Sequence, residues 1–178
     1  MGIFDVFKNK EEKKVIDKDS FMSGLLEMAI REIEYVEPLL KLNNINYEFE
    51  NLIASTFAYY FSIWLAYIEK NTQENIYVEI KNKMQNVSIG LITDSCISSN
   101  LSKDKYIEIF NNNFESAIIE SKTSIDGETF YDKGITDKYL LSLINSQDIF
   151  TIKNQMQIRI LQYWSQVASE AMKQTKIK

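Results

Sequence analysis

One stretch of the chain, from Leu52 to Ile68, reads LIASTFAYYFSIWLAYI and contains no charged residue. A helix that is apolar around its whole circumference is either buried in protein or placed in lipid. A membrane span requires roughly 20 apolar residues and concentrates its tyrosines at the two interfaces. Here Tyr59 and Tyr60 would lie near the middle of the bilayer. The stretch therefore predicts a buried central helix, at about residues 47–70.

Small side chains recur at every fourth position of this predicted helix. The four residues lie on one face and form a ridge that allows a second helix to approach closely. They are Ala54, Ala58, Ser62 and Ala66.

The composition favours a bundle of helices around that central helix. The chain has 178 residues, of which 45% are hydrophobic, and this is enough for one domain with a continuous core. Five glycines and one proline supply too few turns for a multi-stranded β fold. We therefore predict an all-α, single-domain bundle of about six helices over residues 20–174. Residues 1–19 form an amphipathic, charged segment that can be flexible.

Several polar residues mark where helices of the first half begin and end. Asp19 or Ser20 can cap the first long helix by accepting hydrogen bonds from its exposed amides. Pro38 lacks a backbone donor, which predicts a kink or break near Glu37. Asn46 is the expected cap of the central helix.

Similar signals organise the second half. Asn71 and Glu74 have the spacing of a capping box, and Ser102 is a ready N-cap. Residues 122–135 have no helical period and are expected to form a long loop, which makes them a candidate contact surface. Thr136 is then expected to cap a short helix.

The last helix, at about residues 147–172, carries two apolar stripes. Two stripes on one helix predict burial on two sides, either inside the bundle or against another subunit. We take Ile160, Trp164 and Ala168 as the candidate interface. The first stripe consists of Ile149, Ile152, Met156, Ile160, Tyr163 and Val167, and the second of Phe150, Leu161, Trp164, Ala168 and Ala171.

Most catalytic chemistry is excluded by composition. The absence of histidine removes imidazole-dependent triads and most zinc sites, and the single Cys96 cannot form a thiolate metal site. No phosphate-binding loop or dinucleotide-binding motif occurs. Glu34 and Glu37 could share a magnesium ion, but a solvated acidic face is the better interpretation. We expect no enzyme activity, no cofactor and no metal.

Charge and cysteine content bear on partners and compartment. The net charge of −5 opposes attraction to nucleic acid, and only Arg31 and Arg159 are arginines. A single cysteine and no recognisable signal peptide favour the cytoplasm. The opening MGIFDVFK and the many Ile, Asn and Lys residues are typical of a bacterium with an AT-rich genome.

These observations leave three functional hypotheses. The first is a non-catalytic interaction module that associates with itself, as a homo-oligomer, or with another protein. The second is a small-molecule-binding bundle in which Tyr60, Trp64 and Tyr67 line an apolar pocket.

The third hypothesis is a peripheral membrane protein at the inner face of the cell membrane. Its contact residues would be Ile3, Phe4 and Phe7, which precede a charged run and could rest on a membrane or enter a partner's groove.

Overall fold

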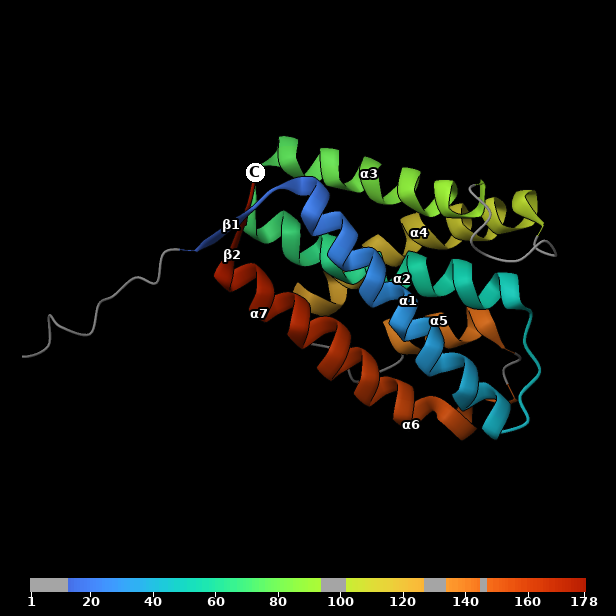
Figure 1. Cartoon of the computed structure of the whole chain (residues 1–178). Coiled ribbons are helices and arrows are strands. Elements are labelled where there is room, and N and C mark those ends of the chain that lie inside the picture. Colours follow the sequence, from blue (N-terminus) through green and yellow to red (C-terminus); the bar gives the residue numbers. More distant parts are fainter. Residues whose placement is uncertain (1–12, 94–101, 127–133, 145–146) are drawn as a thin grey trace, which may run out of the picture.

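The computed structural model describes residues 13–93, 102–126, 134–144 and 147–178. It confirms the all-α helical bundle (Figure 1). We call the unbroken series α6, η2 and α7 the last helix; η2 is a π-helical segment. The elements are β1 (Lys14–Ile16), α1 (Lys18–Leu42), α2 (Phe49–Asn71), α3 (Glu74–Thr93), α4 (Lys103–Asp126), α5 (Ile135–Leu143), α6 (Ile149–Arg159), η2 (Ile160–Gln166), α7 (Val167–Gln174) and β2 (Thr175–Ile177).

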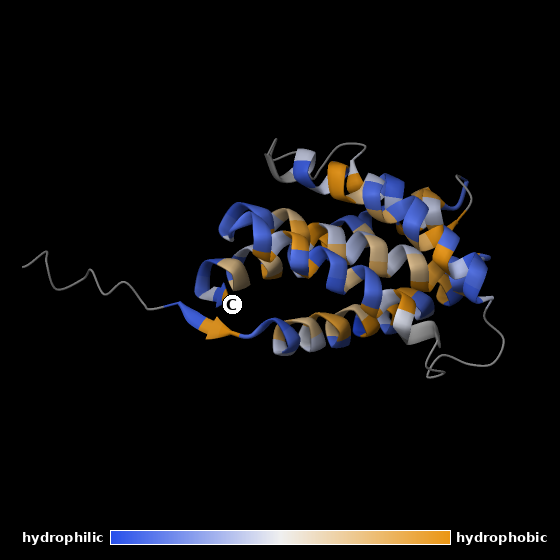
Figure 2. Ribbon diagram, turned by 90° about the horizontal axis from the view of Figure 1, so that it is seen from above, coloured by the Kyte–Doolittle hydropathy of each residue, from blue (hydrophilic) through white to orange (hydrophobic). Residues whose placement is uncertain are grey.

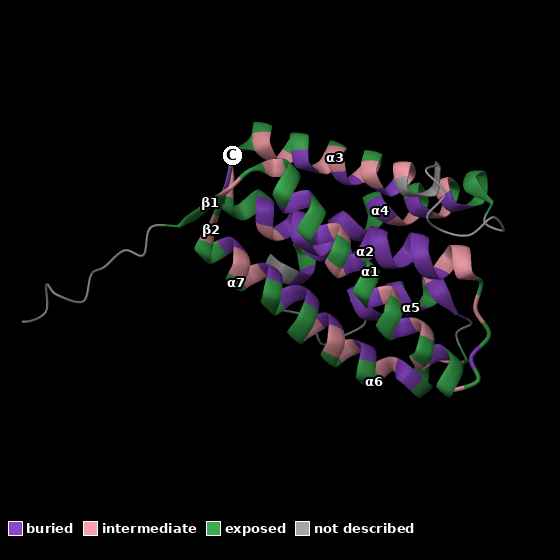
Figure 3. Cartoon of the chain, viewed as in Figure 1, coloured by how far each residue is buried: buried purple, intermediate pink, exposed green. Residues whose placement is uncertain are grey.

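Helix α2 is the centre of the bundle, as the uncharged stretch predicts. Every residue from Leu52 to Ile68 is buried except the half-buried Tyr67, and α2 is the most continuously buried helix in Figure 3. The surrounding helices mix hydrophilic and hydrophobic residues along their length (Figure 2), as expected for helices buried on one side. Among the described residues, no helix combines the length and apolar character needed to cross a membrane.

Helices α2 and α4 pack side by side in parallel. The Asn113 amide donates to Ser55 Oγ at 3.0 Å, and further along both helices the Ser62 and Ser121 hydroxyls lie 2.8 Å apart. From the first contact to the second, the residue numbers increase along both helices, so the two helices run in the same direction. Ser62 belongs to the predicted ridge of small side chains, so the structure confirms the close approach of a second helix at that position.

The start of α1 differs from the prediction. Its N-cap is Asp17, whose carboxylate accepts hydrogen bonds from the backbone N–H of Asp19 at 3.1 Å and of Ser20 at 2.9 Å. The predicted caps therefore lie inside the first turn. Asp17 reaches the same amides from an extended conformation, which suits an N-cap.

Of the two outcomes predicted near Glu37, a kink or a break, the break is wrong, because α1 continues through Pro38 to Leu42. Val36 and Leu40 are both fully buried, one before and one after the proline. Packing of this face holds the helix together despite the backbone hydrogen bond that Pro38 cannot donate.

Two further predicted caps around α2 are not used. Its N-cap is Glu48 rather than Asn46, and Asn71 lies inside α2, where its amide donates to the Tyr67 carbonyl oxygen at 2.7 Å. Asn71 therefore closes α2 instead of opening α3. The turn before α2 has Asn44 at φ 53°, a left-handed conformation that asparagine tolerates well.

The second half gives mixed results. Ser102 is confirmed as the cap of α4, since its hydroxyl accepts from the Lys105 backbone N–H at 3.4 Å. The loop predicted from residue 122 is wrong in its first part, because α4 continues to Asp126, and residues 127–133 lie outside the described residues. Thr136 lies in the first turn of α5, whose N-cap is Gly134, and its side chain is buried instead of capping.

The two described ends of the chain meet in a small parallel sheet that the sequence did not predict. Strand β1 pairs with β2, with Val15 opposite Lys176, and the Lys178 N–H donates to the Ile16 carbonyl at 3.1 Å (Figure 1). Three-residue strands give no readable alternation, and their pairing joins distant parts of the chain. Both strands lie just outside the predicted domain 20–174, whose limits remain a prediction.

Candidate interaction surface

The buried side chains of the last helix recur at every fourth position over most of its length. In a regular α-helix a four-residue step turns about 40° past a full turn, so five such steps turn about 200°, away from the core. The π-helical segment has wider turns, which offset part of this rotation. It therefore keeps one face on the core, formed by Ile152, Met156, Ile160, Trp164, Ala168 and Met172.

The π segment changes the meaning of the two predicted stripes. Trp164 and Ala168, assigned to the second stripe, join the buried face, whereas Tyr163 and Val167 of the first stripe are exposed. Within this chain the last helix is thus buried on one side. The two stripes alone no longer argue for a second buried side.

The three candidate interface residues lie inside the bundle. Ile160, Trp164 and Ala168 are at most 1% exposed, and the Trp164 ring packs edge-on against Tyr60 and Tyr139 at centroid distances of 5.4 and 5.2 Å. They are core residues of this chain, and a contact surface has to use the opposite side of the helix.

That opposite side, which we call the outer face, is exposed and uncharged. Between Lys153 and Glu170 the only charged residue is Arg159. By contrast, the exposed side of α1 carries Glu27 and Arg31 as an ion pair. The outer face consists of Phe150, Asn154, Gln155, Ile158, Gln162, Tyr163, Gln166 and Val167, all exposed (Figure 3).

Arg159 adds no free charge to this face because it is bound to α1. Its Nε and one terminal nitrogen each donate to Glu32 at 2.7 Å, forming a bidentate pair in which Glu32 is only 6% exposed. The guanidinium lies 4.3 Å from the ring centroid of Tyr35 and 4.1 Å from that of Tyr163. The hydrogen bonds to Glu32 raise the pKa of Arg159, so its guanidinium stays charged. The pair connects α1 to the last helix where η2 begins.

Replacing Arg159 by alanine is expected to lower the free energy of unfolding by about 3–5 kcal/mol, because it leaves the buried Glu32 carboxylate without its partner. The matched control is Arg31→Ala, whose exposed pair with Glu27 contributes about 0–1 kcal/mol. Urea unfolding of both variants measures the difference. Equal losses would contradict the importance of burial, and Glu32→Leu combined with Arg159→Met is expected to recover most of the loss.

The residues proposed to line a small-molecule pocket are packed against other side chains. Tyr60 and Trp64 are 1% and 2% exposed, and the half-buried Tyr67 places its hydroxyl 2.6 Å from that of Ser165. Phe21 packs edge-on against Trp64 at 5.7 Å. These contacts tie α2 to α1 and to the last helix.

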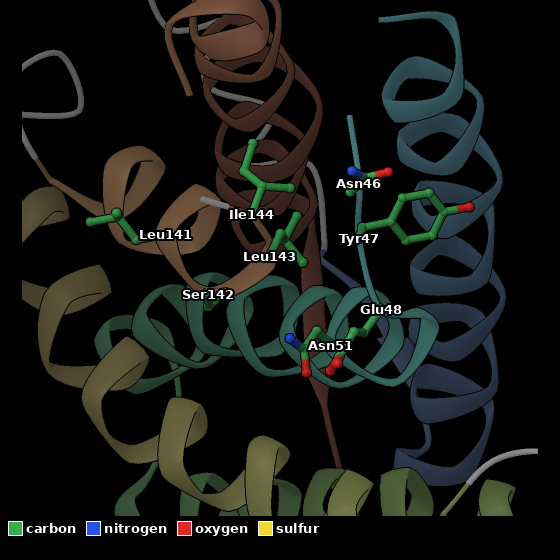
Figure 4. A pocket seen from close by; sticks show the side chains of 8 residues that line it. All are labelled: Asn46, Tyr47, Glu48, Asn51, Leu141, Ser142, Leu143 and Ile144. Carbon is green, nitrogen blue, oxygen red and sulfur yellow. The ribbon is translucent and has the colours of Figure 1, made fainter. Parts of the chain in front are cut away.

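A hollow lies elsewhere, between the turn before α2 and the end of α5 (Figure 4). It has a volume of about 440 Å³, and Figure 4 shows polar side chains on its α2 side and, apart from Ser142, apolar ones on its α5 side. Glu48, its one carboxylate, is already paired with Lys105 at 2.6 Å. Its lining residues are Asn46, Tyr47, Glu48, Asn51, Leu141, Ser142, Leu143 and Ile144.

The acidic pair considered for magnesium is partly occupied by protein groups. Glu37 pairs with Lys41 at 2.7 Å and accepts a hydrogen bond from the Tyr47 hydroxyl at 2.8 Å. The hydrogen bond from Lys41, followed by that from Tyr47, lowers the pKa of Glu37. Within the described residues, no three Asp, Glu, Cys or His side chains gather as a metal site.

The remaining candidates lie outside the described residues. They are Cys96 and the proposed membrane or partner contacts Ile3, Phe4 and Phe7.

Fold and surface together define a helical bundle whose last helix has an uncharged, exposed face. Comparison with models of known protein families, with curated proteins and with solved structures finds no match. Any functional conclusion therefore depends on the geometry described above.

Proposed function

We propose that the protein is a non-catalytic association module that binds a protein partner through the outer face of the last helix. The observation that carries this proposal is the exposed, uncharged run between Lys153 and Glu170. The centres of protein interfaces are depleted in charge and enriched in aromatic residues. The same proposal includes a location in the bacterial cytoplasm, which the presence of only one cysteine favours.

The exposed apolar side chains supply the driving force. Phe150 is 82% exposed and Ile158 55% exposed. Fully burying a side chain of this size contributes about 1.5–3 kcal/mol. Single exposed apolar residues are common, but here several share one face with only neutral amides between them.

A photo-crosslinking amino acid at Ile158 is expected to form a protein adduct in the producing cell. The matched control is Ile119 on α4, which is 65% exposed but lies among charged neighbours such as Glu115 and Glu120. Illumination followed by denaturing electrophoresis should give adducts from the first position and not from the second. If the two positions give equal adducts, or none, the proposed function is wrong.

A further inference from the structure

At the edge of the outer face, where its exposed residues meet the half-buried Gln157 and Leu161, the last helix has a hollow that can receive a side chain from another helix. It has a volume of about 320 Å³ and is lined by Asn154, Gln157, Ile158 and Leu161. These four positions have the spacing i, i+3, i+4 and i+7. In packed helices, four residues at this spacing form the hole that accepts one side chain of the facing helix. The hollow therefore fits a helical partner.

A matching side chain lies on the same helix. Phe150 is 82% exposed and stands one turn before Asn154, on the same stripe as the hollow. Aromatic side chains that fill a pocket of the partner are the usual anchors of protein interfaces. One copy of the chain thus carries both an exposed anchor and a hole.

We infer that the partner is a second copy of this chain, with the two last helices antiparallel and a twofold axis near Asn154. Each Phe150 then enters the hollow of the other copy, which satisfies the requirement that a twofold interface be self-complementary. This inference rests on the proposed association through the outer face.

Charge supports a second copy meeting at this face. Two chains of net charge −5 repel each other in general. Around the hollow, however, Lys153 is paired with Asp137 at 2.8 Å and Arg159 is paired with Glu32. The two basic side chains nearest the hollow are therefore neutralised within each copy.

Light scattering coupled to size exclusion chromatography measures the molar mass in solution and so tests whether the partner is a second copy of the chain. The full-length chain is expected to have twice its 20.8 kDa mass, and Phe150→Asp is expected to weaken dimerisation at least about tenfold. Ile119→Asp, equally a charge at an exposed apolar position, should leave the dimer unchanged. A monomeric wild-type chain, or a dimer that tolerates Phe150→Asp, would overturn the inference. Circular dichroism is used to check that each variant is folded.

A cysteine crosslink tests the antiparallel register. In a Cys96→Ser background, Asn154→Cys should link to itself across the axis with a short bifunctional maleimide, whereas Ile119→Cys should not. Failure of the Asn154→Cys link in a dimer would overturn the register.

The photo-crosslink at Ile158 distinguishes this inference from the proposed function. Adducts at a mass other than twice that of the chain would reject the second copy as the partner but keep the association function. The absence of any adduct would reject both.

Discussion

Raising the pH from about 10 to about 12 is expected to unfold the protein, because buried tyrosines resist ionisation in the folded state. Burial raises the pKa of Tyr59 to about 12 from its usual value near 10. The unfolded chain therefore loses these protons first, and stability falls as the pH rises above the unfolded pKa. Burial raises the pKa of four tyrosines in this way, namely Tyr59, Tyr60, Tyr106 and Tyr139.

The expected loss is large compared with the total stability. Each such tyrosine contributes up to about 1.4 kcal/mol of destabilisation for each unit of pH. Four of them together exceed about 5 kcal/mol for each unit, whereas a typical domain is stable by about 5–15 kcal/mol. All four side chains are at most 3% exposed, so solvent screens little of this effect.

The measurement compares tyrosinate absorbance with far-ultraviolet circular dichroism during an alkaline titration. A fraction of the tyrosines is expected to ionise only as the helices unfold. Tyr59→Phe removes one buried hydroxyl and should move the transition to higher pH. Ionisation of every tyrosine near its usual pKa while the helices remain intact would contradict the prediction.

The central helix could be predicted because its signal is local. An uninterrupted run without charge has to be buried in protein or in lipid, and the position of Tyr59 and Tyr60 favoured protein. The four-residue repeat that includes Ser62 marks where α4 packs. The N-cap residues were harder to predict, because neighbouring polar residues compete for the same backbone amides. Asp17, Asp19 and Ser20 are all good caps in isolation, and only the path of the chain decides among them.

The candidate surface could be predicted only in part. The sequence showed that the last helix has too many apolar positions for one regular stripe, but it could not show the π segment that combines Ile160, Trp164 and Ala168 into the core. The sequence therefore suggested a contact surface at these three residues, whereas the structure buries them and exposes the opposite side of the last helix. The pairing of Arg159 with Glu32 and that of β1 with β2 join residues far apart in the sequence, which no local pattern reveals.

Deleting Gln162 is expected to leave the protein folded, with a change of less than about 1 kcal/mol in the free energy of unfolding. Gln162 is exposed and lies within η2. Its removal changes the step from Ile160 to Trp164 from four residues to three. The spacings of the buried positions become four, four, three, four and four. In a regular α-helix their net rotation then falls from about 200° to about 100°, which one apolar stripe can span, so the core face is kept without a π segment.

Deleting Asn112 provides the contrast, since it is equally exposed but lies in α4, which is regular throughout. The deletion rotates everything after it by about 100° and turns Phe114 and Ala117 away from α2. Loss of Phe114 packing alone corresponds to about 3–5 kcal/mol, so this variant is expected to lose its fold. Thermal unfolding of both deletions decides the matter. If both are equally damaging, the π segment does more than correct the register of the buried face, and our explanation of it is wrong.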